Sequence, residues 1–332
     1  MSFRLKPDAQ AMRGILYYTM SMATFSLMDA TIKHLIGTFH FSQIILFRSL
    51  FAIPPMLVYF YFSGVKLSLP RKNWALHVIR LLCMFVAMSL FFVSLRGLKL
   101  GQATAIALLA PVLMTVFSVI VMRERVTRGR IVALLLGLCG PVLIVKPFAG
   151  TWSDAEFVYV NMALFSTIFY AGAVTLTKML ADRGEGDNNV MATSLGLTAL
   201  SIPVASVSWQ ASWLDHYEFF IAAGLFGGLA TILAVRAVEL ASIGTIAPFD
   251  YTMFLFAAFI GYVVWDESLG WPVWVGVALV ALSMVIIRFE DQRRAAIVGA
   301  GGGVPTDPVA PPAGDQLVTS RGSQEAGRVV GP

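Results

Sequence analysis

The sequence predicts an all-α membrane protein with ten transmembrane helices arranged as two inverted five-helix repeats. The first observation is composition: 58% of the 332 residues are hydrophobic and only 13% are charged, which leaves too little polar surface for a water-soluble globule of this size. The second is that apolar runs of about 20 residues, the length that crosses the hydrocarbon layer, can be placed ten times. The third is an internal duplication, in which residues 101–147 resemble residues 244–288.

The ten expected spans follow one another along the chain. They lie at about residues 14–36, 43–62, 74–95, 102–122, 130–148, 157–180, 190–209, 217–238, 243–264 and 271–288. Strands of a membrane barrel would alternate apolar and polar residues, which these runs do not, so each span is predicted to be a helix that satisfies its own backbone. The first span is expected to stay in the mature protein, because it exceeds a typical signal core and no small-residue cleavage pattern follows it.

The duplicated blocks share an apolar helix that ends in an acidic motif and is followed by an apolar helix containing glycine. A shift of 143 residues places Glu124 on Glu267 and Gly101 on Gly244. Because five helices per repeat is an odd number, the second repeat enters the membrane with the opposite orientation. Internal symmetry of this kind in an apolar chain is typical of secondary transporters that work by alternating access.

The distribution of lysine and arginine predicts the orientation and the domain boundaries. With a cytoplasmic N-terminus, 16 of the 24 Lys and Arg residues lie on the inner side and only four, Lys33, Arg96, Lys99 and Lys146, on the outer side, which favours both termini inside. The expected parts are a cytoplasmic N-terminus (1–13), a first repeat (14–148), a second repeat (157–288) and a disordered cytoplasmic tail (289–332) rich in Gly, Pro and Ala. The positive net charge reflects this topology, and no nucleic-acid partner is expected.

The duplicated blocks resemble the repeat of the drug/metabolite transporter superfamily, in particular its ten-helix EamA-type members. The residues that carry this resemblance are Pro111, Arg123-Glu124-Arg125 and Gly137 in one half, and Ala247-Pro248, Glu267 and Gly276 in the other. Within the superfamily, three further segments look like the branch of bacterial riboflavin importers and S-adenosylmethionine uptake carriers: Ser26 to Ala30 with Lys33, Phe47-Arg48-Ser49, and Ala247 to Tyr251. The resemblance implies a transporter in the bacterial inner membrane, with riboflavin uptake as the leading cargo and S-adenosylmethionine uptake or amino-acid and metabolite efflux as alternatives.

Four charged residues are expected inside the membrane, where each costs about 2.5–3.5 kcal/mol on insertion scales and therefore needs a partner or a task. Their depths predict an outer cluster of Asp29, Lys33 and Arg48 and an inner pair of Arg80 and Asp250, which act as gates or proton-sensitive locks. The competing interpretation is that these side chains are permanent ties between helices or anchors that reach the interface.

Other candidate residues fall into two groups. The repeat motif contributes Pro111, Glu124, Pro248 and Glu267; the glutamates are interpreted mainly as braces at helix ends, and the prolines free carbonyl groups that can serve a ligand or a kink. A cavity for an aromatic cargo would need flat apolar walls and neutral hydrogen-bonding groups. The walls are predicted from Tyr18, Phe25, Phe92, Tyr170 and Tyr251, and the polar groups from Gln102, Thr104 and Asn161.

Other functional classes are disfavoured by missing motifs. The four histidines do not form an HExxH pattern and no GxSxG elbow occurs, so an intramembrane enzyme is the weaker alternative. No metal or cofactor is predicted; Cys83 and Cys139 lie in apolar spans and are interpreted as core residues. A channel lacks its charged ring, and a structural or assembly protein is a further alternative. The expected partners are a small-molecule substrate and the lipid bilayer, with a homodimer left open; the direction of transport and the coupling ion are also open.

Overall fold

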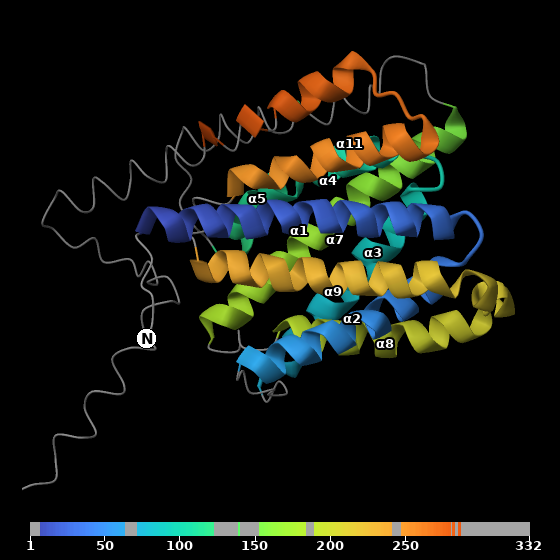
Figure 1. Cartoon of the computed structure of the whole chain (residues 1–332), viewed down its shortest axis with the longest axis horizontal. Helices are drawn as coiled ribbons and strands as arrows, with labels where there is room; N and C mark the ends of the chain where they lie inside the picture. Colours follow the sequence, from blue (N-terminus) through green and yellow to red (C-terminus); the bar gives the residue numbers. More distant parts are fainter. Residues whose placement is uncertain are drawn as a thin grey trace, which may run out of the picture. The chain divides into compact units, whose positions relative to one another are not determined.

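The computed structural model describes residues 7–63, 72–122, 139, 153–183, 189–240, 247–279, 281–282 and 285–286. All of them belong to the compact unit Met1–Asp291, whereas the second unit, Gln292–Pro332, which includes most of the predicted tail, lies outside the described residues. The regular structure of the described part is helical throughout (Figure 1). The helices are α1 (Pro7–Ile36), α2 (Phe41–Ser63), α3 (Trp74–Ser94), α4 (Leu100–Ala107), α5 (Ala110–Met122), α7 (Asp154–Asp182), α8 (Asn189–Val207), α9 (Tyr217–Leu240) and α11 (Tyr251–Trp265), with 3-10 turns η1 (Ala211–His216) and η2 (Ala247–Asp250).

The helices are apolar enough to confirm the predicted class, an all-α membrane protein. By length and composition, Phe41–Ser63, Trp74–Ser94, Glu156–Leu180 and Ala211–Leu240 could each cross a membrane, and three shorter apolar helices cover Leu100–Met114, Met191–Val207 and Tyr251–Trp265. The expected fifth span, 130–148, lies outside the described residues except for Cys139. Residues 271–279 of the expected tenth span are helical.

The expected fourth span, 102–122, is not one helix. The chain leaves the helical path at Leu108 and Leu109, between α4 and α5. Pro111 explains the position of this break, because proline has no N–H to donate to the carbonyl group of Ala107 and its ring clashes with that carbonyl. In the second half, the 3-10 turn η2, which contains Pro248, precedes α11. In each half a proline therefore lies where the apolar segment departs from a regular α-helix.

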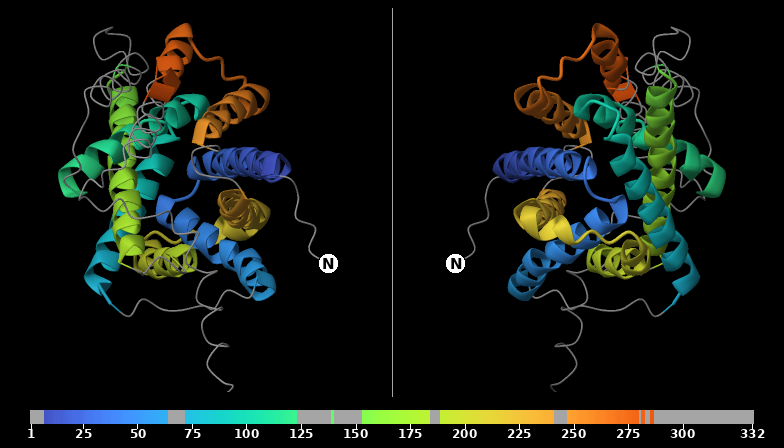
Figure 2. Two further views of the ribbon diagram at one scale, coloured as in Figure 1. Left: turned by 90° about the vertical axis from the view of Figure 1, so that its left-hand side faces the viewer. Right: turned by 90° about the vertical axis from the view of Figure 1, so that its right-hand side faces the viewer.

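Helices from the first half pack mainly on helices from the second half. α1 runs along α9 and also contacts α11, α3 runs along α7, and α2 lies against α8 and α9. Figure 2 shows α1 beside α9 and α11 when the helices are seen end-on. If the two halves are exchanged, the pair of α1 and α9 becomes the pair of α7 and α3, so the main contacts obey the predicted duplication.

Glycines on α9 allow it to approach α2 closely. A Cβ atom at Gly224 would lie 2.3 Å from the Cβ of Phe51 and 2.9 Å from its backbone, and one at Gly228 would lie 2.9 Å from the carbonyl oxygen of Ala52. Small residues let helices approach in lipid, and here the helix backbones themselves are the obstacle to a larger side chain.

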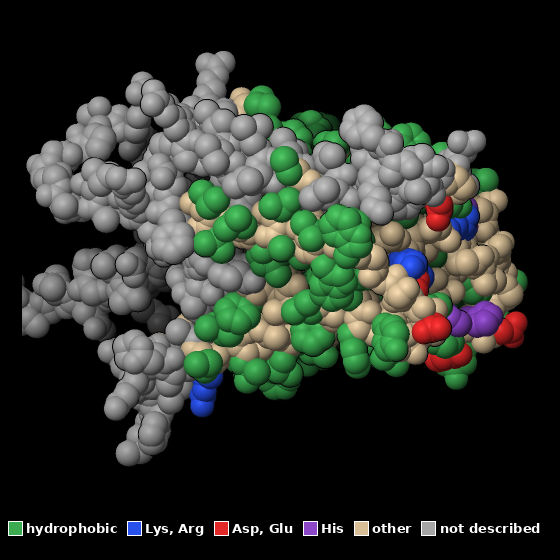
Figure 3. All heavy atoms as spheres, turned by 90° about the horizontal axis from the view of Figure 1, so that it is seen from above, with side chains coloured by type: hydrophobic (Ala, Val, Ile, Leu, Met, Phe, Trp, Pro, Cys, Tyr) green, Lys and Arg blue, Asp and Glu red, His purple; other side chains and the backbone are tan. Residues whose placement is uncertain are grey.

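The flank formed by α11 is apolar, whereas charged side chains gather toward one end of the helices. Leu255, Phe259 and Tyr262 are among the exposed large apolar residues of α11. Figure 3 shows apolar side chains spread over this flank, with acidic, basic and histidine side chains toward the end at which α1 finishes. This distribution fits a surface that faces lipid along its length and water at its end.

Candidate functional site

One face of α1 carries four of the candidate residues predicted from the sequence. Tyr18, Phe25, Asp29 and Lys33 are separated by seven, four and four residues, which places them on a single helix face. α11 lies beside α1 and runs from Tyr251, next to Asp250, to Trp265, two residues before Glu267. We call the two ends of this helix pair the Asp250 end and the Glu267 end.

At the Glu267 end, Lys33 forms a largely, though not fully, buried ion pair with Glu267. The two side chains are only 10% and 13% exposed. Lys33 Nζ also donates to the carbonyl oxygen of Leu98 at 2.9 Å and lies 5.4 Å from the ring centre of Trp265. The other carboxylate oxygen of Glu267 accepts a hydrogen bond of 2.8 Å from the backbone N–H of Leu100, at the start of α4. This pair thus joins α1, the beginning of α4 and the end of α11.

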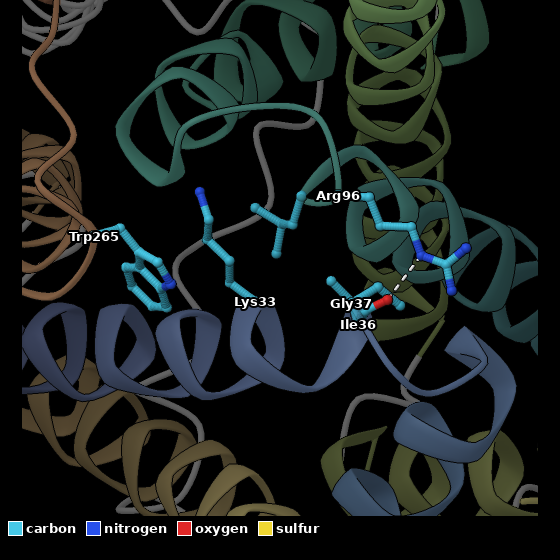
Figure 4. A pocket seen from close by; sticks show the side chains of 6 residues that line it. Lys33, Ile36, Gly37, Arg96 and Trp265 are labelled. Carbon is cyan, nitrogen blue, oxygen red and sulfur yellow. Dashed lines mark hydrogen bonds between the residues drawn. The ribbon is translucent and has the colours of Figure 1, made fainter.

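A hollow of about 360 Å³ lies beside this ion pair. It is lined by Lys33, Ile36, Gly37, Leu95, Arg96 and Trp265. In Figure 4 the side chains of Lys33 and Trp265 face the same open space, while Arg96 turns toward the end of α1. The hollow therefore combines a cation, an indole ring and apolar walls at the mouth of the helix pair.

Arg96 fixes the loop between α1 and α2 at the rim of this hollow. Its Nε donates to the carbonyl oxygen of Ile36 at 2.8 Å and its Nη2 to that of Phe39 at 3.1 Å, which satisfies carbonyl groups at the end of α1. In the same loop, burial and the nearby Arg96 guanidinium hold the pKa of His40 below its usual value. His40 Nδ1 lies 2.7 Å from Ser42 Oγ, a contact that suits the neutral ring.

At the Asp250 end, a tyrosine on α1 holds the acidic residue that precedes α11. Tyr18 Oη donates to Asp250 Oδ1 at 2.5 Å. Tyr170 on α7 and Tyr251 on α11 lie near enough to interact with Asp250 electrostatically. Four predicted candidates thus meet at one point, contributed by α1, α7 and the start of α11.

Between the two ends, Asp29 and Arg48 lie near one another but do not form an ion pair within 4 Å in the described part of the chain. Asp29 is 3% exposed. The guanidinium of Arg48 on α2 contacts sulfur atoms instead of oxygen: Nε lies 3.1 Å from Met28 Sδ, and Nη1 lies 3.9 Å from Met88 Sδ. Gly227 of α9 leaves room for both side chains, because a Cβ there would lie 3.1 Å from Met28 Sδ and 3.7 Å from Arg48 Cζ.

The structure changes the predicted grouping of the charged residues. Lys33 has Glu267 as its partner, so the expected outer cluster with Asp29 and Arg48 is divided in two. Arg80 does not pair with Asp250; its Nη1 donates to Thr193 Oγ1 on α8 at 2.7 Å, because α3 presents Arg80 toward α8 while α1 provides the partner of Asp250. Arg80 is 2% exposed, and its Nε and Nη2 have no partner among the described atoms.

The neutral groups expected to face a cargo have other contacts. Gln102 Oε1 accepts from the backbone N–H of Lys99 at 3.2 Å and so caps α4, and Asn161 Nδ2 donates to the carbonyl oxygen of Phe157 on its own helix. Thr104 donates to the carbonyl oxygen of Leu100.

Phe92 is 2% exposed inside the apolar core, and Phe25 packs against that core. Of the repeat-motif residues, Glu124 lies outside the described residues.

Comparison with known proteins gives the family. The model of the EamA-like transporter family matches residues 12–146 and again residues 158–289. The chain belongs to this family. It is accordingly a multi-pass membrane transporter whose two halves each match one copy of the family's repeat, as the duplicated blocks predict.

Several curated relatives cover most of the chain. The pseudopaline exporter CntI of Pseudomonas aeruginosa is 26% identical over 276 residues, which is 81% of this chain and 95% of the exporter. A riboflavin transporter of Vibrio cholerae is 24% identical and covers 73% of this chain and 81% of its own length. An S-adenosylmethionine uptake transporter of Rickettsia bellii is 22% identical and covers 84% and 94%. All three are named as transporters, which accords with the prediction of a non-enzymatic role.

A solved crystal structure has the same fold. It is similar with a TM-score of 0.59 at 17% sequence identity, and the similarity covers 86% of this chain and 99% of that protein. At this identity the likeness concerns the fold alone.

Proposed function

We propose that this protein is a secondary transporter that moves a small metabolite across the membrane by alternating access. The observation that carries the proposal is that α1 and the α11 segment are joined at both ends by polar contacts, Tyr18 with Asp250 and Lys33 with Glu267. The two positions on α1 are 15 residues apart, or about 22 Å at 1.5 Å per residue. The central charges Asp29 and Arg48 belong to the region between these contacts.

In this mechanism the two contacts are gates that open in turn. Breaking the Lys33–Glu267 pair frees the end of α11 from α1 and exposes the hollow beside Trp265, while Glu267 keeps its hydrogen bond to the N–H of Leu100 at the start of α4. Breaking the Tyr18–Asp250 hydrogen bond frees the opposite end. Inverted repeats favour such an exchange, since the two halves can adopt each other's arrangement around a site near the middle of the membrane.

Riboflavin uptake is the cargo and direction predicted from the sequence, and the relative from Vibrio cholerae named as a riboflavin transporter supports it. S-adenosylmethionine is a second candidate that a specific observation favours. Riboflavin carries no ionised group at neutral pH, whereas Asp29 and Arg48 place opposite charges between the gates, and the neutral groups Gln102 and Asn161 are engaged in backbone contacts.

The test measures uptake of both cargoes in one host. A riboflavin-auxotrophic bacterium expressing the full chain is assayed for growth at low riboflavin and for accumulation of labelled riboflavin and labelled S-adenosylmethionine. We expect uptake of one cargo, its reduction by at least tenfold in Tyr18→Phe, and no change in Arg236→Gln, which removes a cation from an exposed pair with Glu239. Absence of uptake of either cargo, with the protein present in the membrane, would reject this function.

We also propose that the chain lies in the bacterial inner membrane with both termini in the cytoplasm, which places the Glu267 end outside. The excess of Lys and Arg at the expected inner loops supports this orientation. Alkaline phosphatase, which is active only outside the cytoplasm, is fused after residue 294 or inserted after residue 97. We expect activity only from the second fusion, and the reverse pattern would contradict the orientation.

A further inference from the structure

Arg80 on α3 carries a pair of parallel N–H groups that no described residue uses. Its Nη1 donates to Thr193 Oγ1 on α8 at 2.7 Å, while Nε and Nη2 are buried and have no hydrogen-bond partner among the described atoms. In the planar guanidinium, Nε–H and one N–H of Nη2 point in the same direction. This edge is the one that binds a carboxylate or phosphate through two hydrogen bonds, so the unused part of Arg80 is a two-pronged donor for an oxyanion.

The charge of Arg80 is also unbalanced within the described part of the chain. The ion pairs found there join Lys33 to Glu267 and Arg236 to Glu239, and the hydroxyl group of Thr193 is neutral. A buried cation in a membrane protein is costly unless it is paired and hydrogen-bonded. Arg80 therefore calls for an anion that the described helices do not supply.

The position of Arg80 along α3 indicates where such an anion would lie. Arg80 is six residues after Trp74, the first residue of the helix, which is about 9 Å at 1.5 Å per residue. Side chains lean toward the N-terminus of their helix, so the guanidinium is directed back toward the Trp74 end. Trp74 is exposed, and exposed tryptophans gather where the membrane meets water. The free edge of Arg80 is thus closer to the head groups of the lipids than to the middle of the membrane.

The seam between α3 and α8 is bordered by apolar residues that suit lipid chains. The exposed large apolar side chains beside Arg80 on the two helices are Val78, Ile79, Leu82 and Leu195. By contrast, the gates of the proposed transport route lie between α1 and α11. An anion at Arg80 therefore belongs to the lipid-facing flank.

The contact across this seam can yield to a ligand. A Cβ atom at Gly196 of α8 would lie 2.6 Å from Cδ1 of Leu81, so the neighbour of Arg80 fills the seam with the end of a flexible side chain. Arg80 is 2% exposed, and a movement of such a side chain gives access to its guanidinium without separating two helix backbones.

We propose that Nε and Nη2 of Arg80 bind a phosphate group, that of an acidic phospholipid whose head group enters between α3 and α8. In the proposed orientation the start of α3 lies at the cytoplasmic face, where basic pockets between helices bind acidic head groups. The bound phosphate would join the two helices, because Nη1 of the same guanidinium holds Thr193. This site goes beyond the proposed transport function and does not depend on its cargo.

The experiment measures lipid binding to the purified full chain in detergent. The probes are fluorescent phosphatidylglycerol and fluorescent phosphatidylcholine, whose phosphate is balanced by its own choline cation, with inorganic phosphate as a soluble competitor. Affinities are determined for the wild type, Arg80→Gln, Arg80→Lys and the matched control Arg183→Gln. Arg183 is an exposed cation near the same end of α3, with its Nη1 3.3 Å from Asn73 Oδ1, so the control removes the same charge from the same region.

We expect the wild type and the Arg183→Gln control to bind phosphatidylglycerol at least tenfold more tightly than phosphatidylcholine. Arg80→Gln should reduce this preference to less than threefold while its affinity for phosphatidylcholine stays within threefold of the wild type. Arg80→Lys should be intermediate, because an ammonium group keeps the charge without the parallel N–H pair. Binding of phosphatidylglycerol that millimolar inorganic phosphate does not displace assigns the phosphate to a lipid, whereas complete displacement shows that the same site also accepts a soluble phosphate.

Two results would overturn the inference. The first is read on the wild type and so does not depend on a variant that folds: equal affinity for the two lipids and no displacement by inorganic phosphate would mean that no anion enters this seam. The second is an unchanged preference for phosphatidylglycerol in Arg80→Gln and Arg80→Lys, at melting temperatures equal to that of the wild type, which would assign the preference to other cations. If Arg80→Gln does not fold, Arg80→Lys alone decides, since it must lower the preference at least threefold.

Discussion

Replacing Lys33 by methionine should open the Glu267 end of the protein. Methionine preserves the length and the apolar stem of lysine and can still pack on Trp265, so the change removes mainly the charge. The lost contacts are the ion pair with Glu267 and the hydrogen bond to the carbonyl oxygen of Leu98. α1 would then lack its polar connection to the residues that follow α11.

The size of the free-energy change caused by Lys33→Met follows from the burial of the ion pair and from the contacts that Glu267 keeps. Removing one partner of a buried ion pair costs about 3–5 kcal/mol. Here the side chains of Lys33 and Glu267 are 10% and 13% exposed, and Glu267 keeps the N–H of Leu100 at 2.8 Å, a hydrogen bond to a charged group worth about 1.5–3 kcal/mol. We therefore expect Lys33→Met to reduce the free energy that favours the closed Glu267 end by about 1–3 kcal/mol. This raises the ratio of open to closed molecules about 5–150-fold.

The assay is the reaction rate of a cysteine placed in the hollow. Leu95 lines the hollow and is 2% exposed, so Leu95→Cys should react slowly with a membrane-impermeant maleimide while the end is closed. The native Cys83 and Cys139 are replaced by alanine first. Lys33→Met should accelerate labelling of this cysteine about 5–150-fold, in proportion to the open population.

The control variant and the Lys33→Met variant should differ clearly in labelling rate. Arg236→Gln removes a cation from a pair that is 46% exposed on both sides, and it should leave the labelling rate within twofold of the parent. If Lys33→Met also stays within twofold while its melting temperature in detergent matches the parent, the ion pair does not close this end and the gating mechanism is wrong.

Three further predictions address other parts of the molecule. Asp29→Asn and Asp250→Asn should each reduce transport at least tenfold at normal abundance in the membrane, and full activity of both proteins would exclude roles in gating and in cargo binding. Gly224→Ala should lower the melting temperature, because its Cβ meets backbone atoms at 2.9 Å and overpacking costs about 1–3 kcal/mol, whereas Gly172→Ala, with nothing within 4 Å, should leave it unchanged or raise it. The pKa of His40 is lowered in the folded state. The contribution of neutral His40 to the free energy of unfolding should therefore be fully present above the unfolded pKa of about 6.5 and be lost as the pH falls below that value. His40→Asn should make the melting temperature depend less on pH over this range.

The sequence predicts what depends on local pattern and misses what depends on helix rotation. Apolar runs locate the spans to within a few residues over α2, α3 and α9. In the fourth span hydropathy continues unbroken through Leu108 and Leu109, so it predicts one helix, whereas Pro111 predicts the interruption that the structure shows. Where the two signals disagree, a proline predicts a kink more reliably than an apolar run predicts a continuous helix.

The partners of charged residues are harder to predict, because depth along a helix does not say which neighbour the side chain faces. Asp29 and Lys33 share a face of α1, yet only Lys33 reaches the end of α11. Its partner Glu267 is 234 residues away, and its place in the sequence predicts only a brace at a helix end. Arg80 has the predicted depth for Asp250, but its helix packs on α7 and borders α8, so it meets Thr193 instead.

The two seams that should be equivalent under exchange of the halves are unequal, and the inequality bears on how the protein opens. α2 packs along α9, whereas the corresponding helices α8 and α3 contact each other little. In the first seam Gly224 faces the backbone of Phe51, so the contact is rigid. In the second, a Cβ atom at Gly196 would meet the flexible Leu81 side chain, at 2.6 Å from its Cδ1. A contact made by side-chain ends yields at lower cost than one between backbones. If the protein works by the proposed alternating access, we therefore expect α3 and α8 to separate more readily than α2 and α9.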